Sequence, residues 1–235
     1  MRELATAFLI VLWASAAHAQ LPDPPPAPTD ADVARARALF VEGVQHAQDR
    51  RWDEALDAFL RSYATSGSPA ALFNVGSALR ELGRYREARD AFDRLLEDPA
   101  LDDDTRARAE ELRTETAARV ARVRLEGVPP GEARVTGAGA PRETPERPIE
   151  LELDPGARAL GVELPGYAPW RWSGTLAPGA ELVLDASLSS LSAGDPLPWF
   201  LGAAGIVIAG VIVALVVADA EAQLDPRTPL SIALP

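Results

Sequence analysis

The stretch RWDEALDAFLR at residues 51–61 returns as RYREARDAFDR at residues 84–94. From residue 51 to residue 84 the offset is 33 residues, and the same offset relates ALF at 38–40 to ALF at 71–73. Apolar residues in both copies recur at helical spacing. A repeat of this period that is built from two helices predicts an array in which each unit buries its apolar face against the next unit.

The repeated residues resemble the tetratricopeptide (TPR) pattern, in which a large apolar residue, a small residue, an alanine, an aromatic residue and a later proline recur. The resemblance implies a short TPR-like array with a capping helix over residues 31–120. Gly43 and Gly76 are expected to face the alanines of the second helix, and Phe59 and Phe92 to fill the gap to the next unit. The matching residues are Leu39, Gly43, Ala55, Phe59 and Pro69 in the first unit, and Leu72, Gly76, Ala88, Phe92 and Pro99 in the second.

Residues at the expected helix ends fit this interpretation. Ser68 followed by Pro69 is typical of a helix start, and Gly83 is expected to separate the two helices of the second unit. The polar segment LDDDTRARAEELRTETAARV follows Pro99, and its acidic start at 102–104 suits the positive end of a helix dipole. That acidic run lacks the alternating ligands and the glycine of a calcium loop, so we interpret the segment as the capping helix.

Two units and a cap are fewer than the roughly three repeats that usually give such an array independent stability. The open end is therefore expected to be covered by the following β region, by a second copy of the chain or by a partner. Pairs of small residues four apart at 205 and 209 and at 210 and 214 can permit close packing of helices, so a homo-oligomer is a further hypothesis.

From residue 121 to residue 188 apolar and polar residues alternate, and proline and glycine separate short runs. The segments ARVRLEGV, IELEL, ALGVELPGY and ELVLDASL are predicted to be short antiparallel strands of a small β-sandwich. The runs VPPGEARV, TPERPIELELDPG and LPGY are similar to the PEGA domain, a small β module found beside TPR arrays in bacterial envelope proteins. The predicted fold class is therefore α + β multidomain.

Both ends of the chain predict contact with a membrane. Residues 1–19 have the layout of a secretory signal peptide cleaved after Ala19, with an uncleaved signal anchor as the alternative. Residues 197–218 contain no charge and are long enough to form one transmembrane helix. Proline-rich or polar linkers are predicted at 20–30 and 189–196, and a cytoplasmic tail at 219–235. With the resemblance, this predicts a single-pass inner-membrane protein whose globular part lies in the periplasm.

Composition excludes several classes of function. The formal net charge is −12, and none of the 23 basic residues is a lysine, so nucleic acid is not an expected partner. The chain contains no cysteine, hence no thiolate nucleophile or metal ligand. Beyond the predicted signal peptide the one histidine is His46, on the inner face of a repeat helix. We therefore expect no enzyme activity, no cofactor and no metal site.

The resemblance to TPR proteins implies a ligand groove lined by residues of the first helix of each unit. An extended peptide would meet apolar side chains there, and two polar side chains could hold its backbone or a carboxylate. The alternative is that Phe40 and Phe73, the two phenylalanines of this set, belong to the core. The implied residues are Phe40, Val44 and Ala47 in the first unit and Phe73, Asn74, Ser77 and Arg80 in the second. The predicted function is that of a membrane-anchored periplasmic scaffold or adaptor that binds a protein or peptide.

A second hypothesis places the function in the β region. In YAPWRW, Tyr167 precedes Trp170 and Trp172, and alternate residues of a strand share one face. Two indoles on one face could form a platform for a sugar ring, which predicts an envelope glycan-binding module. The alternative is that the tryptophans fill the core of a small sandwich.

Overall fold

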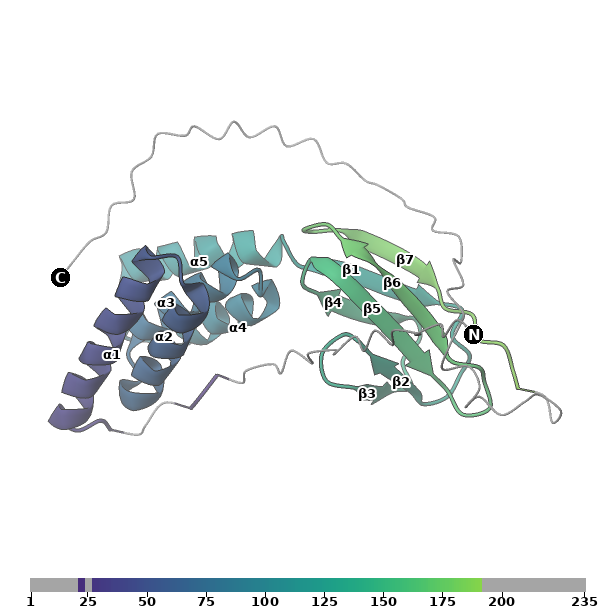
Figure 1. Ribbon diagram of the computed structural model, residues 1–235, viewed down its shortest axis with the longest axis horizontal. Helices are drawn as coiled ribbons and strands as arrows, with labels where there is room; N and C mark the ends of the chain where they lie inside the picture. The colour runs from purple at the N-terminus through teal and green to yellow at the C-terminus, as the bar shows by residue number, and fades with distance from the viewer. Residues whose placement is uncertain (1–20, 24–26, 192–235) are drawn as a thin grey trace, which may run out of the picture.

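The computed structural model describes residues 21–23 and 27–191 of the chain. Within this part, helices come first and strands follow, and the two groups form two adjoining modules (Figure 1). The α + β arrangement predicted from the change in periodicity is confirmed. The predicted signal peptide, transmembrane segment and tail lie outside the described residues. No helix in the described part is long and apolar enough to cross a membrane.

Each helix of the first module packs against the helix that follows it in the chain. The first four therefore form two helix pairs, one for each copy of the repeat, and the last helix continues the series (Figure 1). This is the array that the 33-residue offset predicts. The helices are α1 (Asp30–Gln48), α2 (Trp52–Ser66), α3 (Pro69–Glu81), α4 (Tyr85–Leu96) and α5 (Asp103–Ala117).

The start of α1 is fixed by a reciprocal pair of hydrogen bonds that the sequence analysis did not anticipate. The Asp32 amide donates to the Thr29 hydroxyl oxygen at 3.2 Å, and the Thr29 amide donates to Asp32 Oδ2 at 3.0 Å. Each bond satisfies an amide that the first turn of a helix leaves without a partner. Because the hydroxyl and the amide of Thr29 both donate to it, the Asp32 carboxylate has a pKa below its usual value.

Two other helix starts differ in how they are capped. Asp102 accepts a hydrogen bond from the Thr105 amide at 2.9 Å, so the acidic run begins α5 as predicted. Pro69 is the first residue of α3, also as predicted, but within the described part of the chain the Ser68 side chain makes no capping bond. The turn before α3 depends instead on Gly67, whose φ of +66° ends α2 in the left-handed region.

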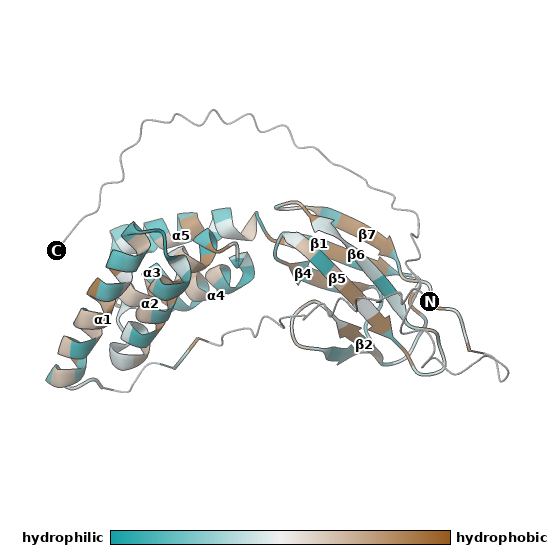
Figure 2. Cartoon of the chain, in the orientation of Figure 1, coloured by the Kyte–Doolittle hydropathy of each residue, from teal (hydrophilic) through white to brown (hydrophobic). Residues whose placement is uncertain are grey.

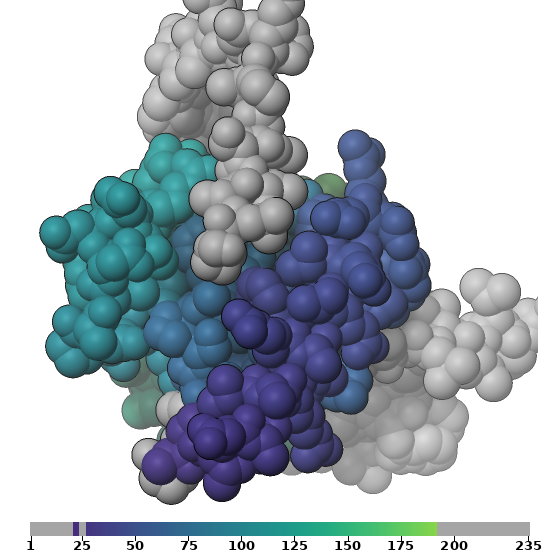
Figure 3. All heavy atoms as spheres, turned by 90° about the vertical axis from the view of Figure 1, so that its left-hand side faces the viewer, coloured from purple at the N-terminus to yellow at the C-terminus, as the bar shows by residue number. Residues whose placement is uncertain are grey.

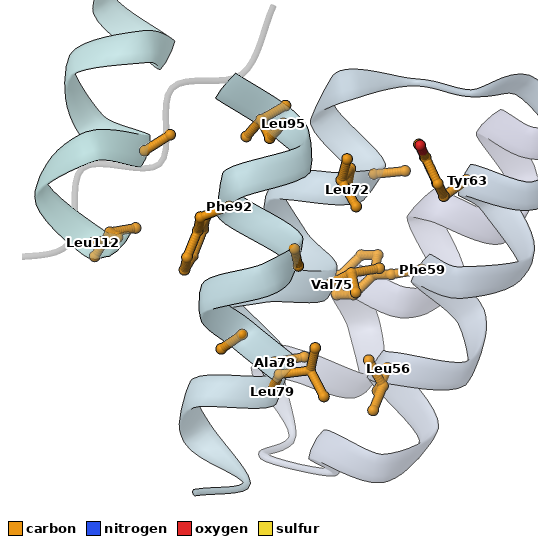
Figure 4. Close-up of a cluster of buried hydrophobic side chains, with 14 of the residues drawn as sticks. Leu56, Phe59, Tyr63, Leu72, Val75, Ala78, Leu79, Phe92, Leu95 and Leu112 are labelled. Carbon is orange, nitrogen blue, oxygen red and sulfur yellow. The ribbon is translucent and has the colours of Figure 1, made fainter. Parts of the chain in front are cut away.

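The two repeated glycines allow a phenylalanine ring to approach the backbone of the preceding helix. A Cβ atom on Gly43 would lie 2.6 Å from Phe59 Cε1, and one on Gly76 would lie 2.7 Å from Phe92 Cε1. Both rings are buried, and Figure 4 shows them directed into the space between the helices. The atoms nearest to a side chain at either glycine belong to the aromatic ring of the same unit, a neighbour that the sequence-based prediction of facing alanines did not name.

The second module consists of two β-sheets that enclose a separate apolar core. One sheet has the strand order β4-β1-β7 and the other has the order β3-β2-β5-β6. Figure 2 shows apolar residues distributed along these strands, and their alternating burial places every second side chain in the core. The strands are β1 (Ala121–Glu126), β2 (Ala133–Thr136), β3 (Arg142–Thr144), β4 (Ile149–Leu153), β5 (Gly156–Glu163), β6 (Trp170–Leu176) and β7 (Glu181–Asp185).

The four predicted strand segments correspond to β1, β4, β5 and β7, and β2, β3 and β6 are not among them. The strand β6 does contain Trp170 and Trp172, which the glycan hypothesis places on one strand. The strand prediction is wrong about one pairing, because β1 and β7 run parallel while the remaining neighbours are antiparallel. A parallel neighbour requires a long crossover, and the whole of the other sheet lies between β1 and β7 along the chain.

The junction between the modules is built on α4. The Asp154 carboxylate, in the turn after β4, accepts a hydrogen bond from the Arg86 amide in the first turn of α4 at 2.9 Å. The residue that precedes α4 provides no side-chain cap of its own, so the β module caps this helix. Next to this bond, Arg89 on α4 pairs with Glu152 on β4 at 2.7 Å. The last helix pair and the β module are therefore directly coupled.

Candidate protein-interaction site

The residues implied as ligand contacts lie on α1 and α3, at equivalent positions of the two repeats. We call this set the first-helix face. All seven are half-buried, and the apolar ones pack against the helical core. The set consists of Phe40, Val44 and Ala47 on α1 and Phe73, Asn74, Ser77 and Arg80 on α3.

Each phenylalanine of the first-helix face rests on the buried phenylalanine of the same repeat. The ring centroids of Phe40 and Phe59 are 5.6 Å apart, and those of Phe73 and Phe92 are 5.9 Å apart with the planes at 68°. Such tilted and edge-on arrangements are favourable for aromatic pairs. The outer rings are thus held in place from below while part of each stays accessible, an arrangement intermediate between a fully exposed groove and a closed core.

The two small polar residues of this face bond to their own helix. The Asn74 amide group donates to the Ala70 carbonyl oxygen at 2.8 Å, and the Ser77 hydroxyl donates to the Phe73 carbonyl oxygen at 3.0 Å. Within the described part of the chain, Asn74 Oδ1 accepts no hydrogen bond, so it remains able to accept one from a backbone amide of a ligand.

Arg80 extends from α3 to α5, where Nη2 donates to Glu115 Oε2 at 3.1 Å. Its side chain is 22% exposed and that of Glu115 is 52% exposed, so the pair has an accessible acidic side. Arg80 Nε is buried and has no hydrogen-bond partner among the described residues. A ligand carboxylate would therefore meet a guanidinium that is already partly neutralised, and it would compete with Glu115.

Figure 3 views the molecule from the end at which α1 lies, with α1 at the lower centre, α5 at the left and residues of the second repeat between them. The second repeat therefore separates the helix that carries Glu115 from the helix that carries Phe40. Sequence reasoning missed Glu115 as a neighbour of the first-helix face. The available signal was its place in a polar helix that continues the array, but choosing it among the acidic residues of that helix requires the packing of α5.

The aromatic residues of the alternative glycan site lie at one edge of the β module. Trp170 and Trp172 lie on β6 and share the face that points toward the sheet core, against which both pack while staying half-exposed. Trp170 Nε1 donates to the Asp185 carbonyl oxygen at 3.1 Å, and the Trp172 ring lies over Gly174. Tyr167 is half-buried and forms a β-bridge with Ser190. The indoles therefore share a face as predicted, and that face is engaged in packing.

Titratable residues in the described part form no cluster of three or more that could hold a metal ion. The imidazole of His46 is 19% exposed, and its Nε2 lies 3.8 Å from Glu42 one helical turn away. Arg84 forms a two-bond pair with Glu87, and this pairing is the main cause that raises the pKa of Arg84. These groups stabilise local structure and do not converge on a common point.

Comparison with protein families identifies a tetratricopeptide repeat at residues 69–98. The match covers α3 and α4, together with the turn between them and the residues just after α4. The helix pair α1–α2 is related to it by the same offset and the same glycine–phenylalanine contact. A search of curated proteins found none with significant similarity to the chain. A TPR repeat is a unit of protein–protein interaction, so the helical module supports a role in binding a protein partner.

Proposed function

We propose that the chain is a non-enzymatic scaffold or adaptor that binds an extended segment of a protein partner across the first-helix face. One observation carries this proposal. Phe40 and Phe73 lie at equivalent positions of successive repeats, and each is supported from below by a buried ring while keeping an accessible side. Two apolar contacts one repeat apart suit a peptide that runs along the array.

The polar residues of the same face give such a peptide direction. Asn74 Oδ1 can accept a hydrogen bond from a backbone amide of the peptide. Arg80 can bind a carboxylate of the peptide through charge-assisted hydrogen bonds if Glu115 turns aside, because only one bond of 3.1 Å joins the two side chains. The accessible Glu115 equally suits a basic side chain of the peptide. The preferred partner segment thus carries apolar residues with charged residues of both signs near them.

The proposed placement is a single-pass protein of the inner membrane with its globular modules in the periplasm. It rests on residues 2–19, which resemble an export signal, and on the uncharged residues 197–218. In this arrangement the PEGA-like β module holds the array at a fixed position above the membrane. The Asp154 cap and the Arg89–Glu152 ion pair between α4 and the β module support that spacer role, because they resist rotation of one module against the other.

A site-specific crosslink tests the adaptor proposal. A photoreactive amino acid at Ser77, on the first-helix face, is compared in intact cells with the same amino acid at Asp57, an exposed position on α2. We expect a discrete crosslinked partner from position 77, lost when Phe73→Ala and Arg80→Ala are added, and none from position 57. Equal crosslinking at the two positions, or crosslinked products that persist when Phe73→Ala and Arg80→Ala are added, would show that this face does not bind the partner.

The glycan hypothesis keeps one favourable observation, the two half-exposed indoles on β6. Its test is sedimentation of the purified full-length chain, in detergent, with cell-wall sacculi. Loss of binding in Trp172→Ala but not in Phe73→Ala would assign the function to the β module. Because Trp170 also bonds to Asp185, the single Trp172 change is the cleaner variant.

A further inference from the structure

A concave site lies on the helical module, and among the described residues its lining contains no residue of the first-helix face. It is a cavity of about 250 Å³ between the end of α2, the start of α3 and the end of α4. We call it the Arg94 notch. The lining residues are Tyr63, Gly67, Pro69, Leu72, Arg94, Leu95, Glu97 and Asp98.

A short segment that precedes α1 lies beside this notch. Arg94 Nη1 donates to the Leu21 carbonyl oxygen at 3.3 Å, and Arg94 Nη2 donates to Asp23 Oδ1 at 2.8 Å. The Leu21 side chain packs against the helical core. The guanidinium lies 5.8 Å from the centroid of the Tyr63 ring, within range of a cation–π contact. One arginine thus binds a backbone carbonyl and a carboxylate of the same segment while an aromatic ring supports it from the side.

These contacts are the kind a bound peptide makes. Residues 21–23 belong to no helix or strand, and Pro22 restricts the backbone φ angle between the two contact residues. The bond to Asp23 is the main cause that raises the pKa of Arg94, and burial is the main cause that raises the pKa of Tyr63. Leu21 contributes an apolar contact with the helical core, and Asp23 contributes a carboxylate that pairs with Arg94. Pro22 separates these two residues by one position.

The segment is bound weakly enough to be displaced. The side chain of Asp23 is 96% exposed and that of Arg94 is 28% exposed, and ion pairs in water of this kind contribute little. The segment stays in place because it is tethered to α1 through residues 24–29, which gives it a high effective concentration at the notch. A ligand of the same chemistry that binds more tightly can replace it.

We propose that the Arg94 notch is a second peptide-docking site for a partner segment with an apolar residue, a proline and an aspartate in that order, and that Leu21–Asp23, bound to Arg94 at the edge of the notch, is an internal competitor for that arginine. The cavity beside the segment accommodates the larger side chains of such a ligand. Because Arg94 is bound to the chain's own segment, a partner that uses Arg94 must displace it, which lowers the apparent affinity of the site for the partner.

The test uses a fluorescent peptide with the sequence of residues 20–29, QLPDPPPAPT, and measures its anisotropy with the full-length chain in detergent. The receptor is compared as wild type, as Leu21→Ala with Asp23→Ala to weaken the internal competitor, and as that variant with Arg94→Ala. Arg61→Ala on α2 is the matched control, because it removes an exposed arginine paired with Asp57. Thermal unfolding by circular dichroism checks that each variant is folded, and Arg94→Lys provides a second variant that keeps the charge.

We expect the peptide to bind the competitor-weakened chain more tightly than wild type by about threefold, and to lose about threefold to fivefold in affinity with Arg94→Ala. Arg94→Lys should give an intermediate loss because lysine cannot donate to two acceptors in the same fork. No binding to the competitor-weakened chain, or binding that does not depend on Arg94, would overturn the proposal. A dimer of the wild-type chain that disappears when Leu21 and Asp23 are changed would also overturn it, since it would assign the notch to a second copy. None of these results affects the crosslink from position 77.

Discussion

Replacing Gly76 with alanine tests the contact on which the repeated pattern rests. The added Cβ atom would lie 2.7 Å from Phe92 Cε1 and 2.8 Å from Cζ, whereas carbon atoms in contact are normally about 3.5–4.0 Å apart. The ring has 0% exposure, so it must move by about 1 Å within a filled core or push α3 away from α4. Overpacking of this kind costs about 1–3 kcal/mol, and alanine recovers about 1 kcal/mol of helix propensity over glycine.

The expected net effect of Gly76→Ala is a loss of about 1 kcal/mol in the free energy of unfolding. For a folded part of this size, that corresponds to a decrease of about 2–4 °C in the melting temperature. Thermal and urea unfolding followed by circular dichroism would measure it. Ser77→Ala, at the next position of the same helix, is the control and should change stability by only a few tenths of a kcal/mol.

Replacing the Phe92 ring with a smaller side chain tests whether the loss of stability in Gly76→Ala is caused by the steric clash with that ring. Combining Gly76→Ala with Phe92→Leu removes the atoms that the new Cβ meets, so the double variant should be more stable than the sum of the two single effects predicts. If Gly76→Ala instead stabilises the chain by about 1 kcal/mol, and Phe92→Leu adds to it independently, the ring does not occupy the space that the glycine leaves. The close approach of helix and ring would then be refuted as the reason for the repeated glycine.

Two further predictions concern helix starts. Asp154→Ala removes the acceptor for the Arg86 amide and should lower the free energy of unfolding by about 1 kcal/mol. Glu152→Ala breaks the more exposed ion pair with Arg89 and should lower the free energy of unfolding by less. Urea unfolding of the two variants would compare these losses. The Asp32 carboxylate has a lowered pKa in the folded chain, so its capping contribution is present above the unfolded value near 3.8 and is lost as the pH falls through the lower folded value. Melting temperatures of wild type and Asp32→Asn should therefore differ at pH 7, and the difference should shrink as the pH falls below about 3.8.

The helices were predictable because local and global signals agree along the repeats. Apolar residues at helical spacing predict the repeat helices, Pro69 independently predicts the start of α3, and the acidic run at 102 predicts the start of α5. The cap at Thr29 was hidden because a proline-rich linker leads directly into it, and an aspartate stands where a capping box usually has glutamate or glutamine. Gly43 and Gly76 were identified as small residues, but which side chain fills their space depends on how the helices cross.

The β module was predicted less completely because its short strands carry weak signals. The strand β3 has only three residues, two of them exposed and charged, so no apolar alternation marks it. The parallel pairing of β1 with β7 joins residues far apart in the chain, such as Val123 and Leu182. Nothing in either strand distinguishes a parallel from an antiparallel neighbour.

Part of the candidate site could be predicted from the sequence, and part of it could not. The repeat offset places Phe40 and Phe73 on equivalent turns, so their shared role follows from the sequence once the repeat is recognised. The partners of the polar residues do not follow from it. Glu115 binds Arg80 from 35 positions away in the chain, and Arg94 binds Leu21 and Asp23, which are 73 and 71 positions away. Contacts between elements that are distant in the chain become visible only when the helices are packed.

A two-repeat array needs its ends covered, and the two ends of this one are treated differently. At one end, α5 packs on α4 and the β module caps the first turn of α4 through Asp154. At the other end, α1 presents Val33 and Val41 at about half exposure, among alanines and charged residues that water accepts readily. The last helix pair is thus covered by α5, and the β region is joined to it through the contacts on α4. The outer surface of α1 tolerates solvent because it is small and polar. Since α4 is both the last repeat helix and the helix capped by the β module, loosening the turn after β4 should weaken the array more than any change on the outer face of α1.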